Sequence, residues 1–343
     1  MIEKKNVRFI YNPFSGIGGK KLILRHIDDI LDHEKFDYDV AFISRPGHAE
    51  ELAREAAQEG VDIICAIGGD GTVNGVAKGL IHTNAALAII PCGSGNGLAR
   101  HLHIPIDWKK AIRLINDGHV RKMDYGVVNL IPFFCTCGVG FDAFISQKFS
   151  KTKVRGPLAY VEKMLINGLR FKPDTYDIEL HTVVAQDGSE ETVDVLNTKA
   201  FMLSVANASQ FGNNAYIAPS ASVFDGLLNV TIVKPFLPTE VAQMTMQLFS
   251  GTLDHNSRIE TYSCKSLSIH RKKAGVMHFD GDPVETSADI EIAVVPEGLW
   301  CVCPKNEGVN GVVKNIQNEL IDQFNLIVRQ LREPLSQLKN IEK

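Results

Sequence analysis

Val61-Asp-Ile-Ile-Cys-Ala-Ile67 leads directly into Gly68-Gly-Asp-Gly-Thr72, and the helix-like run Val73–Leu80 follows. A β-branched stretch, two glycines and a helical pattern are typical of a strand, a tight turn and the start of a helix. Backbone N–H groups at such a junction point toward whatever lies over the turn, and the helix dipole favours an anion there. Glycines let phosphate oxygens approach the main chain, and Asp70 within the turn indicates a bridging cation such as Mg²⁺. The junction therefore favours phosphoryl chemistry.

Length and composition set the broad class. The 343 residues predict two domains, and 45% hydrophobic with 22% charged residues is an ordinary soluble globular composition. A formal net charge of −4 argues against a protein that coats nucleic acid. The 7 cysteines form no Cys-x-x-Cys pair, so the sequence favours reduced thiols in the protein core over a zinc site or disulfides. With no signal-peptide pattern and no run of ~18 apolar residues, we expect a cytosolic protein that touches membranes only at their surface.

The first part of the chain alternates strand-like and helix-like segments. Repeated units of this length predict an α/β domain in which a parallel sheet carries helices on both faces. Ligands on such sheets bind at the carboxyl ends of the strands, and three polar turns fall there: Asn12–Gly16, Gly68–Asn74 and Gly93–Asn96. The expected strands are residues 7–11, 37–44, 61–67 and 86–90, and the expected helices are residues 19–33, 48–60, 73–80 and 97–102.

From about Val127 the pattern becomes β-rich, which predicts a second domain that is an antiparallel sandwich or barrel. One helical stretch, Pro157–Phe171, interrupts it, and residues 309–339 show the apolar stripe of a long helix. We therefore expect domains at 1–127 and 128–304, followed by a C-terminal helix, 305–343, that packs on the first domain or forms a homodimer. The expected β segments are residues 127–139, 175–187, 192–206, 227–233, 264–271 and 289–303.

The polar turns fit neither a Walker A loop nor a G-x-G-x-x-G fingerprint, so the argument rests on the three together. The three turns belong to a larger set of motifs: Asn12-Pro-Phe-Ser-Gly16, Arg45-Pro-Gly-His-Ala49, Gly68-Gly-Asp-Gly-Thr-Val-Asn74, Pro91-Cys-Gly-Ser-Gly-Asn96, Gly138-Val-Gly-Phe-Asp142, Ala218-Pro-Ser-Ala-Ser-Val-Phe-Asp-Gly-Leu227 and Phe279-Asp-Gly-Asp282. With these motifs, the chain resembles the lipid kinases that include bacterial diacylglycerol kinases, sphingosine kinases and ceramide kinases. The resemblance spans residues 7–300 and implies a phosphofructokinase/NAD-kinase-like α/β domain plus a β-sandwich domain, with the nucleotide between them.

The resemblance implies ATP and Mg²⁺ as cofactors. Asp70 would act through Mg²⁺ on the transferred phosphate, or take the proton of the substrate. Ser44 stands where relatives commonly have Thr. The residues expected to contact ATP are Asn12, Pro13, Phe14, Ser15, Gly16, Ser44, Gly68, Gly69, Asp70, Gly71, Thr72, Val73, Asn74, Ser94 and Asn96.

Phe279-Asp-Gly-Asp282 can be read in two ways. Two carboxylates that flank a glycine are often only a hairpin turn. The resemblance instead implies the Asp-Gly-Glu motif of the family, whose acids reach the ATP cleft, where Asp280 or Asp282 would accept the proton of a lipid hydroxyl. Two positions depart from the family pattern. Asp282 replaces the usual Glu, and Gly75 stands where relatives commonly have a Glu directly after the Gly-Gly-Asp-Gly-Thr-x-Asn run.

Two further sites are implied by the resemblance. Asp225, with main-chain oxygens from Ser222 and Leu227, resembles the structural Mg²⁺ site of bacterial relatives, although Asp-Gly alone would indicate a β-turn. Asp142 aligns with a region that meets the lipid head group. The basic and apolar segment 148–172 suits either contact with an anionic membrane or a half-buried helix.

The sequence thus favours an ATP- and Mg²⁺-dependent kinase of a lipid hydroxyl, presented at a membrane surface. The acceptor would be a diacylglycerol-like lipid or a sphingoid base. The Gly-Ser-Gly-Asn form of residues 93–96 resembles sphingosine kinases more than many bacterial diacylglycerol kinases, which slightly favours the sphingoid base. One alternative is a kinase of a soluble substrate of the NAD-kinase type, which shares Gly-Gly-Asp-Gly-Thr. Another is a non-catalytic regulator that binds nucleotide or lipid, which Gly75 and Asp282 would suit.

Overall fold

The first lobe is built on a parallel sheet. The computed structural model describes residues 4–14, 21–150, 171–184, 190–191 and 194–305. Its parallel strands lie in the order β2–β1–β3–β4. The apolar strands β3 and β4 are buried along their whole length, as expected of strands that are covered on both faces. The bounds are β1 Lys5–Tyr11, β2 Phe36–Phe42, β3 Ile63–Gly68 and β4 Ala86–Pro91.

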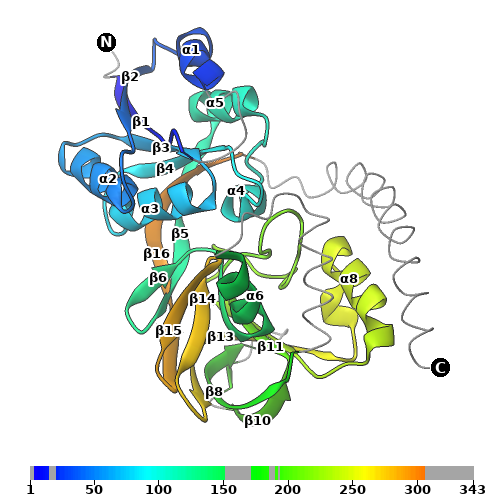
Figure 1. The fold of residues 1–343 in the computed structure, drawn as a ribbon. Coiled ribbons are helices and arrows are strands. Elements are labelled where there is room, and N and C mark those ends of the chain that lie inside the picture. Colours follow the sequence, from blue (N-terminus) through cyan, green and yellow to red (C-terminus); the bar gives the residue numbers. More distant parts are fainter. Residues whose placement is uncertain (1–3, 15–20, 151–170, 185–189, 192–193, 306–343) are drawn as a thin grey trace.

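Helices cover both faces of this sheet (Figure 1). Helices α1 and α5 lie on one face, and α2 and α3 pack together on the other. Each turns its apolar side to the sheet, as α2 does with Ala49, Ala53 and Ala56. The short helix α4 follows β4 and faces the second lobe. The bounds are α1 Lys21–Ile30, α2 His48–Gln58, α3 Asp70–Leu80, α4 Gly97–His101 and α5 Trp108–Asp117.

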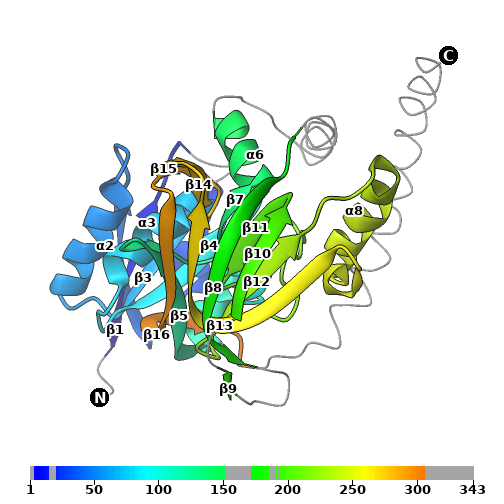
Figure 2. The same ribbon diagram turned by 90° about the horizontal axis from the view of Figure 1, so that it is seen from below.

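The second lobe is an antiparallel β-sandwich. One ladder runs β15–β14–β7–β11–β12–β13, and β8 pairs with β13 and carries β10 and β9 (Figure 2). Helices α6 and α8 cover a separate core that is rich in phenylalanine. The bounds are β6 Ile131–Phe133, β7 Thr136–Gly140, α6 Phe141–Ser150, β8 Asp174–Val184, β9 Glu190–Glu191, β10 Asp194–Ala200, β11 Met202–Ala206, β12 Leu228–Val233, α8 Val241–Ser250, β13 Ile259–Arg271, β14 Gly275–Phe279 and β15 Asp282–Thr286.

Two long strands, β5 (His119–Val128) and β16 (Asp289–Cys303), run through both lobes (Figure 1). They pair with each other over most of their length. In the second lobe β16 pairs with β13, and in the first lobe its final part pairs with β4 in parallel, with Trp300 opposite Ala86. The sheet is therefore continuous from one lobe to the other, and the last described strand completes the first lobe.

The expected α/β lobe followed by a β-sandwich is confirmed. Each of the four early strands lies within two residues of its expected position. Helices α5, α6 and α8 were not expected, although Asp107 gives α5 an N-cap by accepting a hydrogen bond from the Lys110 N–H. The expected helices at 157–171 and 309–339 lie almost wholly or wholly outside the described residues, so the packing of the tail stays a prediction. None of the described helices is long and apolar enough to cross a membrane.

Gly75 has a structural explanation. A β-carbon at this position of α3 would lie 2.8 Å from the β-carbon of Ala49 on α2, and one at Gly79 would lie 2.5 Å from the Glu50 carbonyl oxygen. Glycines four residues apart thus let the two helices approach closely. The absence of a Glu at position 75 follows from this packing.

Candidate active site

The turn after β3 is held by a side chain from the neighbouring strand end. Asn12, which directly follows β1, donates its amide N–H to the Thr72 hydroxyl at 2.8 Å. Its carbonyl oxygen accepts the Phe14 N–H at 2.9 Å, which shapes the following loop. A side chain at Gly68 would overlap that of Thr72, with the added β-carbon 2.3 Å from the hydroxyl oxygen. The first two polar turns are therefore brought together, although Ser15 and Gly16 lie outside the described residues.

Asp70 connects this turn to the third one. Its carboxylate accepts the Asn96 N–H at 2.9 Å and the Gly97 N–H at 2.7 Å, so it caps the start of α4. The turns are in close contact, because a β-carbon at Gly93 would lie 2.7 Å from the α-carbon of Gly69. Asn96, with a φ of 52°, closes the third turn by bonding both the N–H and the carbonyl of Gly93. All three polar turns thus meet at the carboxyl end of the sheet.

Two of the expected ATP contacts lie at the rim of this cluster. Ser94 is exposed in the third turn. Ser44, which follows β2 by two residues, is also exposed. Its main-chain N–H and its hydroxyl both lie about 3 Å from Nδ1 of His48. Main-chain N–H groups, hydroxyls and glycines around one carboxylate are the groups that hold phosphates and a hard cation.

The second acidic motif is a tight hairpin turn that is also anchored to a loop. Asp280 and Gly281 are the two turn residues between the paired Phe279 and Asp282, and both have positive φ, 49° and 90°, as a type I′ turn requires. The Asp280 carboxylate accepts main-chain N–H groups from Phe134, Cys135 and Thr136 at 2.7 to 3.0 Å. Burial raises the pKa of Asp280 above its ordinary value, and these hydrogen bonds act in the opposite direction. Asp282 begins β15 and is exposed.

Asp70 and Asp280 converge on Cys135 from opposite lobes. The Cys135 N–H donates to Asp280, and its sulfur would lie 3.5 Å from a β-carbon at Gly97, the residue whose N–H binds Asp70. Burial, followed by the negative charges of Asp280 and Asp70, raises the pKa of the Cys135 thiol well above its usual value. Two acids far apart in the sequence are therefore linked through Gly97 and Cys135 at the junction of the lobes.

Asp142 lies in the first turn of α6, where it is buried rather than presented to solvent. Its carboxylate pairs with His278 of β14 at 3.0 Å, and the two side chains are 7% and 2% exposed. Contact between Asp142 and a lipid head group stays a prediction, as does any membrane contact by segment 148–172, most of which lies outside the described residues.

The expected metal site at Asp225 lies beside a second carboxylate, that of Asp124. Buried Asp124 accepts the Gly226 N–H at 2.7 Å and the Glu297 N–H at 2.8 Å. Although Asp225 is exposed as a whole residue, partial desolvation raises the pKa of its carboxyl group. The Leu227 N–H opposes this rise, and the charge of Asp124 adds to it.

A partly desolvated carboxylate beside a second acid fits a hard cation. Within the described residues no group of three or more His, Cys, Asp or Glu side chains could hold a metal, so main-chain oxygens would have to complete such a site.

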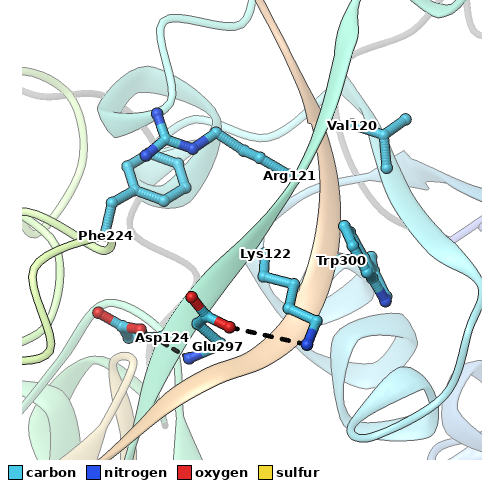
Figure 3. A pocket seen from close by; sticks show the side chains of 7 residues that line it. All are labelled: Val120, Arg121, Lys122, Asp124, Phe224, Glu297 and Trp300. Atoms are coloured by element: carbon cyan, nitrogen blue, oxygen red, sulfur yellow. Dashed lines mark hydrogen bonds and ion pairs between the residues drawn. The ribbon is translucent and has the colours of Figure 1, made fainter.

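Asp124 also lines a surface hollow of about 430 Å³ (Figure 3). The Arg121 guanidinium stacks 3.5 Å above the centre of the Phe224 ring, and the Lys122 ammonium lies 3.7 Å from the Glu297 carboxylate. Basic and acidic side chains are thus mixed along its wall. The lining residues are Val120, Arg121, Lys122, Asp124, Phe224, Glu297 and Trp300.

Sequence reasoning missed three residues at these sites, namely Asp124, Cys135 and His278. Each lies within a strand or a strand connection, and none belongs to a recognisable catalytic motif. The role of each depends on a contact with a segment more than 70 residues away in the sequence, as that of Asp124 does on Gly226. His278 stands directly before the Phe279–Asp282 motif, which is the only signal that could have pointed to it.

Known proteins resemble this chain in both lobes. Residues 6–128 match the diacylglycerol kinase catalytic domain, and residues 135–303 match the YegS C-terminal NAD kinase beta sandwich-like domain. A diacylglycerol kinase of Mycobacterium tuberculosis is 27% identical over 313 residues, which cover 89% of this chain and 97% of that protein. A diacylglycerol kinase of Staphylococcus aureus is 28% identical over 286 residues, 81% of this chain and 86% of that protein.

Solved structures share the fold. A proposed diacylglycerol kinase from Bacillus anthracis superposes with a TM-score of 0.70 at 23% identity, over 88% of this chain and 98% of that one. At this identity the likeness shows the fold alone. The two family matches, which together span both lobes and contain the converging Asp70 and Asp280, carry the assignment: the chain belongs to the diacylglycerol kinase family of lipid kinases.

Proposed function

We propose that this chain is an ATP- and Mg²⁺-dependent kinase that transfers the γ-phosphate to the hydroxyl of a membrane lipid. Diacylglycerol is the first acceptor to test, since the bacterial relatives carry that name, and a sphingoid base is the second. The observation that supports this most strongly is the link across the lobes at Cys135: its N–H donates to Asp280, and its sulfur lies beside Gly97, whose N–H donates to Asp70. The nucleotide would then bind between the lobes, with its phosphates over the turn after β3.

The nucleotide side of the reaction belongs to the first lobe. Main-chain N–H groups of the glycine-rich turns would bind the phosphates, and the Thr72 hydroxyl, oriented by Asn12, would contribute a further donor. Asp70 is the carboxylate that would hold Mg²⁺, since the N–H groups of Asn96 and Gly97 each take one of its acceptor positions and leave others available. When bound, the ion would offset charge on the phosphate oxygens.

The acceptor side belongs to the hairpin turn. Asp280 already accepts three main-chain N–H groups, which fixes it as an anchored negative charge. Among the described residues, the exposed carboxylate of Asp282 makes no hydrogen bond or ion pair. We assign it the role of accepting the hydroxyl proton as the oxygen attacks phosphorus. Asp282→Glu, which restores the residue common in the family, should keep activity, and Asp282→Asn should lose most of it.

The decisive experiment is transfer from radiolabelled ATP to vesicles that contain diacylglycerol, sphingosine or ceramide, with and without Mg²⁺. We expect one lipid to gain label, and Asp70→Asn to lower the rate by about 10³-fold or more while the protein stays folded, because the phosphates lose the group that positions them. A folded Asp70→Asn variant with nearly full activity would contradict the role of this residue.

NAD belongs in the same panel as a soluble acceptor, because the second lobe matches an NAD kinase-like sandwich. Phosphorylation of NAD with no lipid labelled would favour the kinase of a soluble substrate. ATP binding without transfer to any acceptor would favour the non-catalytic regulator.

A further inference from the structure

A buried acid–histidine pair lies behind the turn that carries Asp280. Asp142 lies in the first turn of α6, and His278 lies on β14 two residues before Asp280. Nε2 of His278 is 3.0 Å from Oδ2 of Asp142, and almost none of either side chain reaches solvent. Burying two such groups is costly unless both are fully hydrogen-bonded, so the pair needs an explanation.

The hydrogen bonds of the pair assign its protons. The Gly281 N–H donates to Nδ1 of His278 at 3.4 Å, so Nδ1 is an acceptor and the ring proton lies on Nε2. Nε2 therefore donates to Oδ2 of Asp142, whose other oxygen accepts the Ala143 N–H at 2.7 Å. A chain of hydrogen bonds thus runs from the first turn of α6 to the Asp280–Gly281 turn.

The neighbouring strand leaves space for this carboxylate. Gly138 of β7 lies opposite His278 in the ladder, and a β-carbon there would be 2.2 Å from Oδ2 of Asp142. Gly140, with a φ of 98°, makes the bend that brings Asp142 back over the strand. The two glycines of Gly138-Val-Gly-Phe-Asp142 are thus explained by the placement of Asp142.

We propose that Asp142 and His278 are positioning residues that hold the hairpin turn through Gly281, and so orient Asp280 and Asp282 for phosphoryl transfer. Neither residue touches the reacting atoms in this role. The proposal rests on the proposed kinase function, because it concerns the same turn. Its physical basis is that small displacements of a catalytic group lower the rate steeply.

Three variants separate the two hydrogen bonds of the histidine. His278→Gln places its amide nitrogen near the position of Nε2, so it can still donate to Asp142, but it leaves the Gly281 N–H without its acceptor. His278→Asn is shorter and cannot reach Asp142, but its carbonyl oxygen lies near the position of Nδ1 and can still accept the Gly281 N–H. Asp142→Asn has only one acceptor oxygen, so it cannot accept from both His278 and Ala143. His270→Gln is the matched control, since His270 forms an exposed acid–histidine pair with Asp289 on the sandwich.

For each variant that thermal denaturation shows to be folded, kcat and the KM for ATP are measured with the lipid acceptor found above. We expect His278→Gln and Asp142→Asn to lower kcat by about 10- to 100-fold, with the KM for ATP unchanged within about twofold, because the nucleotide contacts lie on the other lobe. His278→Asn, which keeps an acceptor for the Gly281 N–H, should lose less of kcat than His278→Gln, and His270→Gln should match the wild type. A merely structural pair would show no such separation of kcat from KM.

Amide hydrogen exchange over residues 275–286 gives a readout that needs no activity. Exchange should be about tenfold or more faster in His278→Gln and Asp142→Asn, and the increase should be smaller in His278→Asn. If the wild-type protein labels no lipid, the kinase proposal fails by itself, and this measurement still decides the positioning role. Wild-type kcat and wild-type exchange in both His278→Gln and Asp142→Asn, or damage from His278→Asn that equals or exceeds that from His278→Gln, would overturn the proposal.

Discussion

Three buried or partly buried aspartates, Asp70, Asp124 and Asp280, share one kind of environment. Each carboxylate accepts main-chain N–H groups from segments that are distant in the sequence. Such hydrogen bonds stabilise the charged form and fix its direction. A carboxylate of this kind joins two segments and also leaves a negative charge at a defined point.

Asp280 gives a prediction for stability as a function of pH. Its pKa is raised above the ordinary value of 3.8 by burial, so the native state binds this proton more tightly than the unfolded state does. The contribution of this group to the free energy of unfolding therefore falls as pH rises through the interval just above 3.8. Urea unfolding of the wild type and of Asp280→Asn at a series of pH values should show this fall only in the wild type.

The same variant should also be less stable overall. Asparagine has a single acceptor oxygen, so at least one of the N–H groups of Phe134, Cys135 and Thr136 meets an NH₂ group. We expect a loss of about 1–3 kcal/mol near neutral pH. Equal stability and an identical pH dependence in both proteins would show that Asp280 does not anchor the turn.

Asp225 gives a prediction for metal binding. If Asp225 holds Mg²⁺ with main-chain oxygens, millimolar Mg²⁺ without nucleotide should raise the melting temperature of the wild type, because a ligand of the native state stabilises it by mass action. Asp225→Asn should show little or no rise. Asp70→Asn, which leaves the Asp225 site intact, is the control and should respond like the wild type; a rise in Asp225→Asn as large as in the wild type would place the ion elsewhere.

At the scale of elements, the contact between α2 and α3 depends on two glycines. Gly75→Ala should destabilise the protein by about 1–3 kcal/mol, because its β-carbon would lie 2.8 Å from that of Ala49. Ala49→Gly should restore much of the loss in the Gly75→Ala background, which makes a compensating pair. Gly71→Ala, on the same helix with no neighbouring atom within 4 Å, is the control and should change stability by about 1 kcal/mol or less. Chemical denaturation of the four proteins measures these effects, and a stable Gly75→Ala variant would contradict the tight contact.

The sequence predicted elements better than it predicted their contacts. The strand, turn and helix around Gly68–Asn74 were predicted because apolar runs and glycines are local signals. The hairpin-turn reading of Phe279–Asp282 is confirmed, whereas the role of its acids in an ATP cleft stays a prediction. The meeting of Asp280 with Phe134–Thr136 could not be read from the sequence, because tertiary folding alone brings segments about 145 residues apart together. The same holds for the pair formed by Asp142 and His278.

At the scale of the whole molecule, β16 returns to the first lobe after the second lobe is complete. Its residues Trp300 and Cys301 cover the edge of β4, and β5 pairs with its final part. A fragment of residues 1–128 would therefore expose β4 and β5 as open edges, which invite aggregation. We expect this fragment to be insoluble or unfolded by circular dichroism, whereas residues 1–305 should fold. A soluble, cooperatively unfolding fragment 1–128 would show that the first lobe is independent.

The ladder of β5 and β16 is interrupted at one place only among the described residues, between Val295 and Leu299, where Asp124 binds the Glu297 N–H. Elsewhere, swinging the lobes apart would break rows of main-chain hydrogen bonds. The molecule should consequently behave as one rigid block, in which any bending is confined to that irregularity. If ATP binds between the lobes as proposed, crystals grown with and without nucleotide should superpose closely across both lobes.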